Sequence, residues 1–401
     1  MKVNESKCYQ VGKRQIVMRV LHIGKYFSPF SGGIENFMGD MLPALIESGV
    51  SIAVVLHNHD FSFRKILKER YKGILLYRVP CHGTLLYAPL SPLFPFVLNQ
   101  VIHEFRPDII HAHMPNTSCF STLFLPAAKK IPMIIHWHAD VVQSKLDAGL
   151  RYAYQLYRPF EQKLLKKADR VIATSPLYLK TSSALYNWNY KTSVVPLGLK
   201  PRRDYHASEK NKLWAEQVWG KDRTRMLAIG RLTYYKGHDT LIKAASRVPG
   251  ARVVIVGRGE LMKKLKKTVS DYCIDDRITI IGYLEDDKLN ALLYSSDCLI
   301  LPSIERTEAF GLVLLEAMRA GKPSIICNVK GSGMGWVVKD KITGLHVPPQ
   351  DTYSLSETMK IIDSNPDLRI KMGIHALERF NRYFQIDRIA RLIIDIYKEY
   401  C

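Results

Sequence analysis

Short runs of apolar residues alternate with longer, helix-forming segments along this chain, and the alternation runs twice. In the first half the apolar runs lie at 17–23, 51–57, 73–79, 107–113, 131–138, 168–175 and 192–199. In the second half they lie at 225–232, 251–259, 277–284, 297–303, 323–328 and 343–349. Such runs are typical of strands buried on both faces, and the helix-length spacers supply the crossovers that parallel strands need. We therefore expect an α/β fold with two doubly wound, Rossmann-like parallel-sheet domains.

A polar segment, KPRRDYHASEKNK, interrupts this pattern once and marks a domain boundary. The predicted parts are an amino-terminal extension, a first domain, a linker, a second domain and a carboxyl-terminal helix packing back toward the first domain. Their ranges are 1–15, 16–199, 200–212, 213–375 and 376–401. We expect the two domains to face each other across a cleft at the carboxyl ends of their strands, where open α/β sheets bind ligands.

The chain is strongly basic, because 58 Lys and Arg residues against 37 Asp and Glu residues give a net charge of +21. Nucleic acid, an anionic membrane face, a phosphate-bearing substrate or simply a basic solvated surface would each fit this charge. Two basic clusters lie in the first half, namely Arg64, Lys65, Lys68, Arg70 and Lys72, and Arg151, Arg158, Lys163, Lys166, Lys167 and Arg170. The nearby apolar, proline-rich stretch 87–102 favours an anionic membrane surface. Aromatic residues are not interleaved with the charges, so we expect no nucleic-acid partner.

The cellular location follows from three further features of the sequence. The seven cysteines form no CxxC pair, and the first fifteen residues contain no apolar core. No run reaches the ~18 apolar residues that a membrane span needs. We therefore expect a cytoplasmic protein without a signal peptide, peripheral on the cytoplasmic face of the membrane.

The segment ERTEAFGLVLLEAMRAGKP, at 305–323, places Glu308 ahead of a helix and Glu316 within it. Glu316 follows Leu312 by four residues, so both lie on one face, which the apolar surroundings predict to be inward. A carboxylate there can accept hydrogen bonds from a diol such as a ribose, or it can pair with a core neighbour. The helix amino terminus favours an anion such as a diphosphate, and Glu308 can reach a second polyol.

Three His-x-His pairs lie on the strand segments, at 57/59, 111/113 and 136/138. Side chains two residues apart on a strand point to the same side, a spacing that metal ligands use. A metal-dependent hydrolase is therefore one alternative, although histidines at strand ends also bind polyols and phosphates. Gly257 opens a GxG turn in VIVGRGE that lacks the third glycine of a dinucleotide fingerprint, and the chain has no P-loop.

Taken together, these motifs resemble the retaining glycosyltransferases of family 4, which have the GT-B fold. EAFGLVLLE resembles the Glu-x7-Glu motif of that family. The remaining segments in family order are HIGKYFSPFSGGIE, DIIHAHMP, IIHWHADV, SVVPLGL, AIGRLTYYKG, VIVGRGE, IIGYLEDD and TGLHVPP. The resemblance covers most of the chain. It implies that the first domain binds the acceptor and that the second domain binds a nucleotide-sugar.

The resemblance also implies a role for individual residues. Arg231 and Lys236 would neutralise the donor diphosphate, which favours departure of this leaving group. Glu308 would bind the donor sugar, and His138 would lie over that sugar from the opposite domain, so we take these two as the catalytic residues. The other donor-binding positions implied are Gly32, Gly33, Gly257, Ala309, Phe310, Gly311, Leu312 and Glu316.

Within the family, HWHADVV, YAPLSPLFP and GSGMGWVV resemble mannosyl- and rhamnosyltransferases of bacterial surface polysaccharide (O-antigen) synthesis. This implies a GDP-mannose donor, a lipid-linked oligosaccharide acceptor, and neither cofactor nor metal. A UDP-sugar donor is an alternative within the same class. A non-catalytic nucleotide-sugar binder is another alternative, but it would not need Glu308 and His138.

Overall fold

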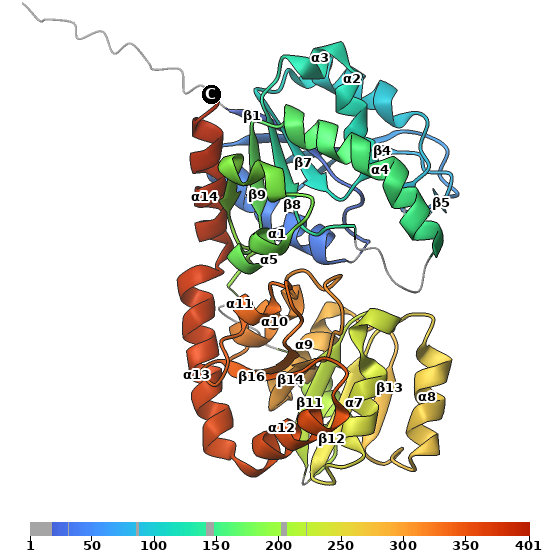
Figure 1. Cartoon of the computed structure of the whole chain (residues 1–401), viewed down its shortest axis with the longest axis vertical. Coiled ribbons are helices and arrows are strands. Elements are labelled where there is room, and N and C mark those ends of the chain that lie inside the picture. Colours follow the sequence, from blue (N-terminus) through green and yellow to red (C-terminus); the bar gives the residue numbers. More distant parts are fainter. Residues whose placement is uncertain (1–17, 31, 86–87, 142–147, 202–206, 222) are drawn as a thin grey trace, which may run out of the picture.

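The computed structural model describes residues 18–30, 32–85, 88–141, 148–201, 207–221 and 223–401. The predicted extension 1–15 lies outside these ranges. Figure 1 shows two α/β domains stacked along the long axis, with the blue-to-green part of the chain in one, the yellow-to-orange part in the other, and the red last helix running beside the first. Among the described residues, no helix combines the length and the apolar character needed to cross a membrane.

The first domain is built on an eight-stranded sheet in the order β10-β9-β8-β7-β1-β2-β4-β3. Its strands are β1 (Arg19–Ile23), β2 (Ser51–His57), β3 (Leu67–Tyr71), β4 (Ile74–Val79), β7 (Ile109–Met114), β8 (Met133–Trp137), β9 (Arg170–Ala173) and β10 (Thr192–Val194). The predicted strands are confirmed and pair in parallel. The antiparallel edge strand β3 was not predicted, because its residues LKERY are polar and mostly exposed. It turns into β4 through Lys72 and Gly73, both at positive φ, as a two-residue hairpin requires.

Helices cover both faces of this sheet. They are α1 (Gly33–Glu47), α2 (Phe94–Phe105), α3 (Pro126–Lys129), α4 (Ala148–Lys167) and α5 (Pro176–Thr181), with 3-10 turns at Thr117–Leu123 and Tyr186–Lys191 and a small hairpin of β5 (Thr84–Leu85) and β6 (Ala88–Pro89). On one face, α2, α3 and α4 cover a separate core. On the other face, α1 and the last helix of the chain enclose a core that continues into the second domain.

The second domain contains a six-stranded sheet in the order β13-β12-β11-β14-β15-β16, parallel throughout as predicted. Its strands are β11 (Thr224–Ile229), β12 (Ala251–Val256), β13 (Ile278–Ile281), β14 (Cys298–Leu301), β15 (Ser324–Cys327) and β16 (Gly344–Val347). Its helices are α6 (Glu209–Trp219), α7 (His238–Ala245), α8 (Met262–Asp271), α9 (Asp286–Ser295), α10 (Leu312–Arg319), α11 (Met334–Val337), α12 (Thr352–Ser364) and α13 (Pro366–Tyr383). The predicted linker 200–212 is too long by four residues. Ser208 caps α6 through its hydroxyl, and Trp219 of that helix is buried in the second domain.

The last helix, α14 (Ile386–Lys398), returns to the first domain and packs along α1 (Figure 1). The chain crosses between the domains at Phe384, whose carbonyl oxygen accepts a 3.0 Å hydrogen bond from the amide of Leu199. The predicted boundary at 375/376 therefore falls inside α13. That helix continues because Phe380 is still buried in the second domain. Near the end of α14, the hydroxyl group of Tyr397 is 2.6 Å from Nδ1 of His111, on β7.

Candidate active site

Glu308 lies in the loop between β14 and α10, and two side chains contact its carboxylate. Lys236 Nζ forms an ion pair with Oε2, and the hydroxyl group of Ser303 donates to the same oxygen at 3.3 Å. The Lys236 and Glu308 side chains are only 10% and 13% exposed. Two residues that the sequence analysis singled out therefore lie together, in a setting where the loss of one would leave the other charge buried.

Glycines allow the loops after the neighbouring strands β11 and β14 to approach this closely. Gly237 has a φ of +68° and caps α7, and a Cβ atom there would overlap the carbonyl oxygen of Pro302. A Cβ atom on Gly257, after β12, would overlap the carbonyl oxygen of Gly230. Because neither position has room for a side chain, the turn after β11 can carry Lys236 to Glu308.

Arg231 lies on the same turn as Lys236 but is exposed, and its Nη2 donates to the hydroxyl group of Tyr235 at 2.9 Å. Its charge also acts on two groups of the first domain. Burial raises the pKa of Glu35, and the charges of Lys25 and Arg231 oppose this rise. Burial lowers the pKa of Lys25, Glu35 opposes this, and Arg231 lowers it further. The charge of Arg231 thus acts across the domain boundary on Glu35, in the first turn of α1.

The start of α1 is formed by Gly32, which caps the helix, and Gly33, its first residue. A Cβ atom on Gly32 would overlap Oε2 of Glu35, whereas a Cβ atom on Gly33 would meet nothing within 4 Å. The first amides of a helix have no intrahelical acceptor and favour an anion. The amide groups at this end of α1 therefore favour an anion, and the carboxylate of Glu35 already accepts a backbone hydrogen bond there.

The remaining donor-side predictions fall on the loop before α10 and on α10 itself. Phe310 points into the core against Trp336 and Phe384, so only the backbone at this position can contact a ligand. Gly311 caps α10 with a φ of +77°. The inward position predicted for Glu316 is wrong: Glu316 and Leu312 are half-buried, at the margin of α10. The buried face of that helix consists of Leu314, Leu315, Ala317 and Met318.

His138 belongs to a stack of buried imidazoles beneath the start of α1. The stack consists of His22, His111, His113, His136 and His138, each at most 5% exposed. His113 is hydrogen-bonded to His138 at 2.9 Å and to His22 at 3.1 Å. Burial is the main cause that lowers the pKa of every member, and the pKa of His113 falls to about 3.

Two of the three His-x-His pairs thus come together, whereas the third does not, since His57 instead contacts Ser118 at 2.8 Å. His22, His111 and His113 place one nitrogen each within 4.8 Å of one another, and so do His113, His136 and His138. Either group could hold a metal ion. A hydrolytic metal, however, needs a coordination position open to water and substrate. Side chains this deeply buried do not provide one, so the geometry does not favour the hydrolase alternative.

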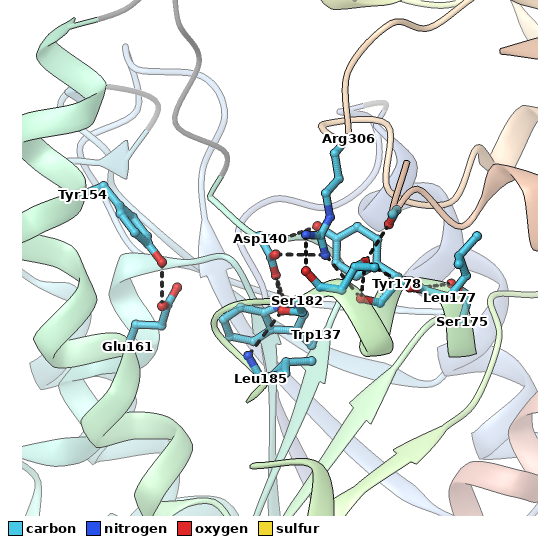
Figure 2. A network of polar contacts seen from close by, with 12 residues as sticks. Trp137, Asp140, Tyr154, Glu161, Ser175, Leu177, Tyr178, Ser182, Leu185 and Arg306 are labelled. Carbon is cyan, nitrogen blue, oxygen red and sulfur yellow. Dashed lines mark hydrogen bonds and ion pairs between the residues drawn. The ribbon is translucent and has the colours of Figure 1, made fainter. Parts of the chain in front are cut away.

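Sequence reasoning missed several residues that position the candidate site. Ser332 Oγ donates to the carbonyl oxygen of Glu308, and the amide of Gly333 donates to the carbonyl oxygen of Ala309 at 2.7 Å. Arg306, two residues before Glu308, contacts Asp140 of the first domain (Figure 2). One sign of this contact was present in the sequence: Asp140 and Arg306 have opposite charges, and each lies two residues from a predicted catalytic residue.

Comparison with known proteins matches both domains to models of one enzyme class. Residues 209–379 match the model described as glycosyl transferases group 1, and residues 32–198 match the glycosyl transferase 4-like domain. The chain is a glycosyltransferase in which a 4-like domain precedes a group 1 domain. The family expected from the motifs is thereby confirmed, and the protein is a hexosyltransferase.

Two curated relatives match this glycosyltransferase over nearly its whole length. O-antigen chain mannosyltransferase C of Escherichia coli is 28% identical over 385 residues, 95% of this chain and 98% of that protein. D-rhamnosyltransferase WbpZ of Pseudomonas aeruginosa is 28% identical over 374 residues, 92% of each chain. Among solved structures, sucrose-phosphate synthase of Thermosynechococcus elongatus matches with a TM-score of 0.78 at 22% identity, covering 95% of this chain and 98% of that one. This likeness confirms the GT-B fold.

Proposed function

We propose that this glycosyltransferase moves mannose from GDP-mannose onto a hydroxyl group of a lipid-linked oligosaccharide during surface polysaccharide synthesis. The main support is the similarity to an O-antigen mannosyltransferase, which extends over both domains and so includes the acceptor side. The Lys236–Glu308 pair adds the chemistry, because it puts a cation and a polyol-binding carboxylate at adjoining strand ends of the second domain.

In this proposal Arg231 and Lys236 bind the donor diphosphate, and the exposed Arg231 can turn from Tyr235 toward it. Glu308 accepts hydrogen bonds from the sugar hydroxyl groups, and Glu316 from the ribose. The start of α1 contributes amide groups at Gly32 and Gly33. His138 is the most exposed member of the histidine stack, at 5%, and we propose that it contacts the sugar from the first domain through Nδ1, which forms no hydrogen bond among the described residues.

The reaction we propose retains the configuration at the sugar and requires no protein nucleophile. The bond between sugar C1 and the diphosphate oxygen breaks, and the acceptor oxygen bonds to C1 on the same face. The acceptor proton passes to the oxygen of the leaving phosphate. Fixed positive charge at the leaving group stabilises the charge that develops there, so we propose that no metal or cofactor takes part.

Nucleotide binding tests this proposal directly. GDP, UDP and ADP are added in turn, with and without EDTA, and the melting temperature is recorded. A ligand at ~100 times its dissociation constant adds about 2.7 kcal/mol to the free energy of unfolding. A shift with GDP alone that EDTA does not change supports the proposal, and mannose transfer from GDP-mannose is then measured. A shift with UDP alone would show that the donor is a UDP-sugar and not GDP-mannose. Loss of stability with EDTA and no shift with any nucleotide would overturn the proposal in favour of a metal site.

We further propose that the first domain docks on the cytoplasmic face of the membrane, where the acceptor is anchored. Exposed apolar side chains follow the carboxyl ends of β2 and β4: Phe61, Phe63, Ile66, Leu85, Leu90, Leu93 and Phe96. On α4, Tyr152 and Leu156 are 72% and 76% exposed and alternate with the exposed Arg151 and Arg158. Exposed apolar and basic side chains in one region are what an anionic lipid surface binds.

Not every lysine in the basic cluster of α4 can contribute to membrane binding. Lys167 Nζ donates to the carbonyl oxygens of Thr122 and Ala128 at 2.8 and 3.1 Å, and burial lowers its pKa to about 8. Arg170 is paired with Glu399. Replacing these residues would therefore perturb the fold as well as the surface charge.

A sharper test replaces the exposed pair Arg151 and Arg158 with glutamate and measures cosedimentation with vesicles that contain anionic lipid. The matched control replaces Lys263 and Lys267, which are exposed on α8 of the second domain, and so makes the same change in net charge. We expect loss of binding only for the α4 variant. Equal binding by both variants would contradict docking through the first domain.

A further inference from the structure

An ion pair joins the two domains beside the candidate active site. Arg306 lies in the β14–α10 loop two residues before Glu308, and Asp140 follows His138 by two residues. Arg306 Nη2 is 3.1 Å from Asp140 Oδ2, and the guanidinium lies over the ring of Tyr178, 4.3 Å from its centroid. Figure 2 shows this group from close by. The pair therefore links the two loops that carry the residues proposed for catalysis.

The guanidinium of Arg306 also binds the backbone of the first domain. Nη1 donates to the carbonyl oxygen of Thr181 at 2.6 Å, and Nη2 donates to that of Tyr178 at 3.2 Å. Arginine can reach a carboxylate and two carbonyl oxygens at once because its donors form a planar fork. A lysine at this position would keep the charge but could not reproduce the arrangement.

Asp140 is also held in place by hydrogen bonds within its own domain. Trp137 Nε1 and Ser182 Oγ donate to Oδ1 at 2.8 and 2.7 Å, and the backbone amide of Asp140 donates to the hydroxyl group of Tyr178 at 2.6 Å. These bonds leave Oδ2 for Arg306. The Asp140 side chain is 9% exposed, so its charge is well shielded from water.

The turn 331–333, between β15 and α11, ties the second domain to the first at a second point. Thr181 Oγ1 donates to the carbonyl oxygen of Gly331 at 3.3 Å, and a Cβ atom on Gly333 would collide with Ser175. The turn 331–333 in turn binds the carbonyl oxygens of Glu308 and Ala309. The backbone around Glu308 is thus positioned partly by α5 of the opposite domain.

We propose that Asp140 and Arg306 are positioning residues, a reversible latch that closes the two domains and fixes the loops of His138 and Glu308 over the donor. This inference rests on the proposed function, since it assigns the donor sugar to Glu308. An ion pair with hydrogen bonds suits such a role because water can replace each of these contacts when the domains separate to release product.

The latch is tested first by distance measurements on the full chain without nucleotide. Spin labels are placed at the exposed Cys273 and at Gln155→Cys on α4, with Cys8 and Cys401 replaced by serine. We expect a single narrow distance in the otherwise unchanged chain. The variants Arg306→Lys and Asp140→Asn should give longer and broader distributions. Distributions that match the unchanged chain would overturn the latch.

The second measurement is kinetic and separates positioning from binding. Because the nucleotide binds the second domain, the variants should keep the donor KM and lose kcat by about 100-fold, as small misplacements of reacting groups do. The double variant Asp140→Asn/Arg306→Lys should be no slower than the slower single variant, since both changes break one contact. Additive losses, or an unchanged kcat, would overturn the positioning role.

The matched control is Arg223→Lys, which breaks the fork of a guanidinium paired with Asp276 at 2.9 Å within the second domain. It should leave both distance and kcat as they are. If the unchanged chain transfers nothing from GDP-mannose, the donor proposed above is wrong. The distance measurement still decides whether the latch exists.

Discussion

Acidification should weaken the first domain, because its buried histidines must remain neutral in the folded chain. Burial lowers the pKa values of His57 and His113 to about 3, whereas an unfolded histidine titrates near 6.5. Below pH 6.5 the unfolded state therefore binds more protons than the folded state, and stability falls as the pH falls. Well below pH 6.5 each such histidine removes about 1.4 kcal/mol per pH unit, but at pH 6.5 only half of the unfolded histidines are protonated, so these two together remove about 3 kcal/mol between pH 6.5 and 5.0.

The other four members of the stack act in the same direction, since burial lowers their pKa values as well. Glu161 acts in the opposite direction. Burial raises its pKa to about 7, so it binds a proton more tightly in the folded chain. Its protonation therefore adds about 2 kcal/mol to the free energy of unfolding between pH 6.5 and 5.0. Glu35, whose pKa burial also raises, stabilises the folded chain on acidification in the same way. The histidines outnumber the carboxyl groups, and a domain with about 5–15 kcal/mol of stability should lose a large part of it by pH 5.

The assay is urea denaturation at half-unit steps from pH 7.5 to 5.0, followed by circular dichroism. His136→Leu removes one titrating group without removing a hydrogen bond among the described residues, and should make the pH dependence shallower by about 1.4 kcal/mol per unit. Glu161→Gln removes an opposing group and should make it steeper. A free energy of unfolding that stays constant between pH 7.5 and 5.0 would refute the reasoning, because the histidines could not then be held neutral by burial.

Three further substitutions test particular contacts. Tyr397→Phe should destabilise the chain by about 1–3 kcal/mol in urea, since it leaves buried His111 without its partner, and no change would mean that α14 is not docked in solution. Lys236→Met should cost roughly 3–5 kcal/mol in thermal unfolding, with part of the loss restored by adding Glu308→Gln; a cost unaffected by the second change would contradict a buried pair. Gly237→Ala should cost at least about 1–2 kcal/mol for its left-handed backbone and should also weaken nucleotide binding, whereas an unaltered melting temperature would contradict the close approach of the two loops.

The parallel strands could be predicted because each is an apolar run long enough to be buried on both faces. β3 could not, since an edge strand is exposed and its residues carry no apolar pattern. The first turn of α6 was assigned to the linker for a related reason, because its sequence EKNK is polar. Only the burial of Trp219 shows that this helix belongs to the second domain. Local pattern thus predicted the elements that lie in the cores and missed those at the margins.

Within the candidate site, the sequence placed Lys236 and Glu308 in loops that follow strands, and the structure makes those two strands, β11 and β14, neighbours. The motifs did not predict the direct pairing, which depends on the shape of two glycine turns. Glu316 was misplaced because helical spacing puts Leu312 and Glu316 on one face without saying which face the sheet covers.

The end of β8 shows why the most distant contacts were beyond prediction from sequence. His138 and Asp140 stand two residues apart. His138 is buried in the histidine stack, whereas Asp140 is fixed by Trp137 from the same strand and reaches the other domain. The end of β8 thus supplies both the proposed catalytic histidine, His138, and the partner of Arg306, Asp140. The position of His138 should therefore depend on the contact between Asp140 and Arg306 that holds the domains together. We therefore expect substitutions at Asp140 to change the environment of His138 as well as the distance between the domains, and NMR of the His138 ring in Asp140→Asn would detect that coupling.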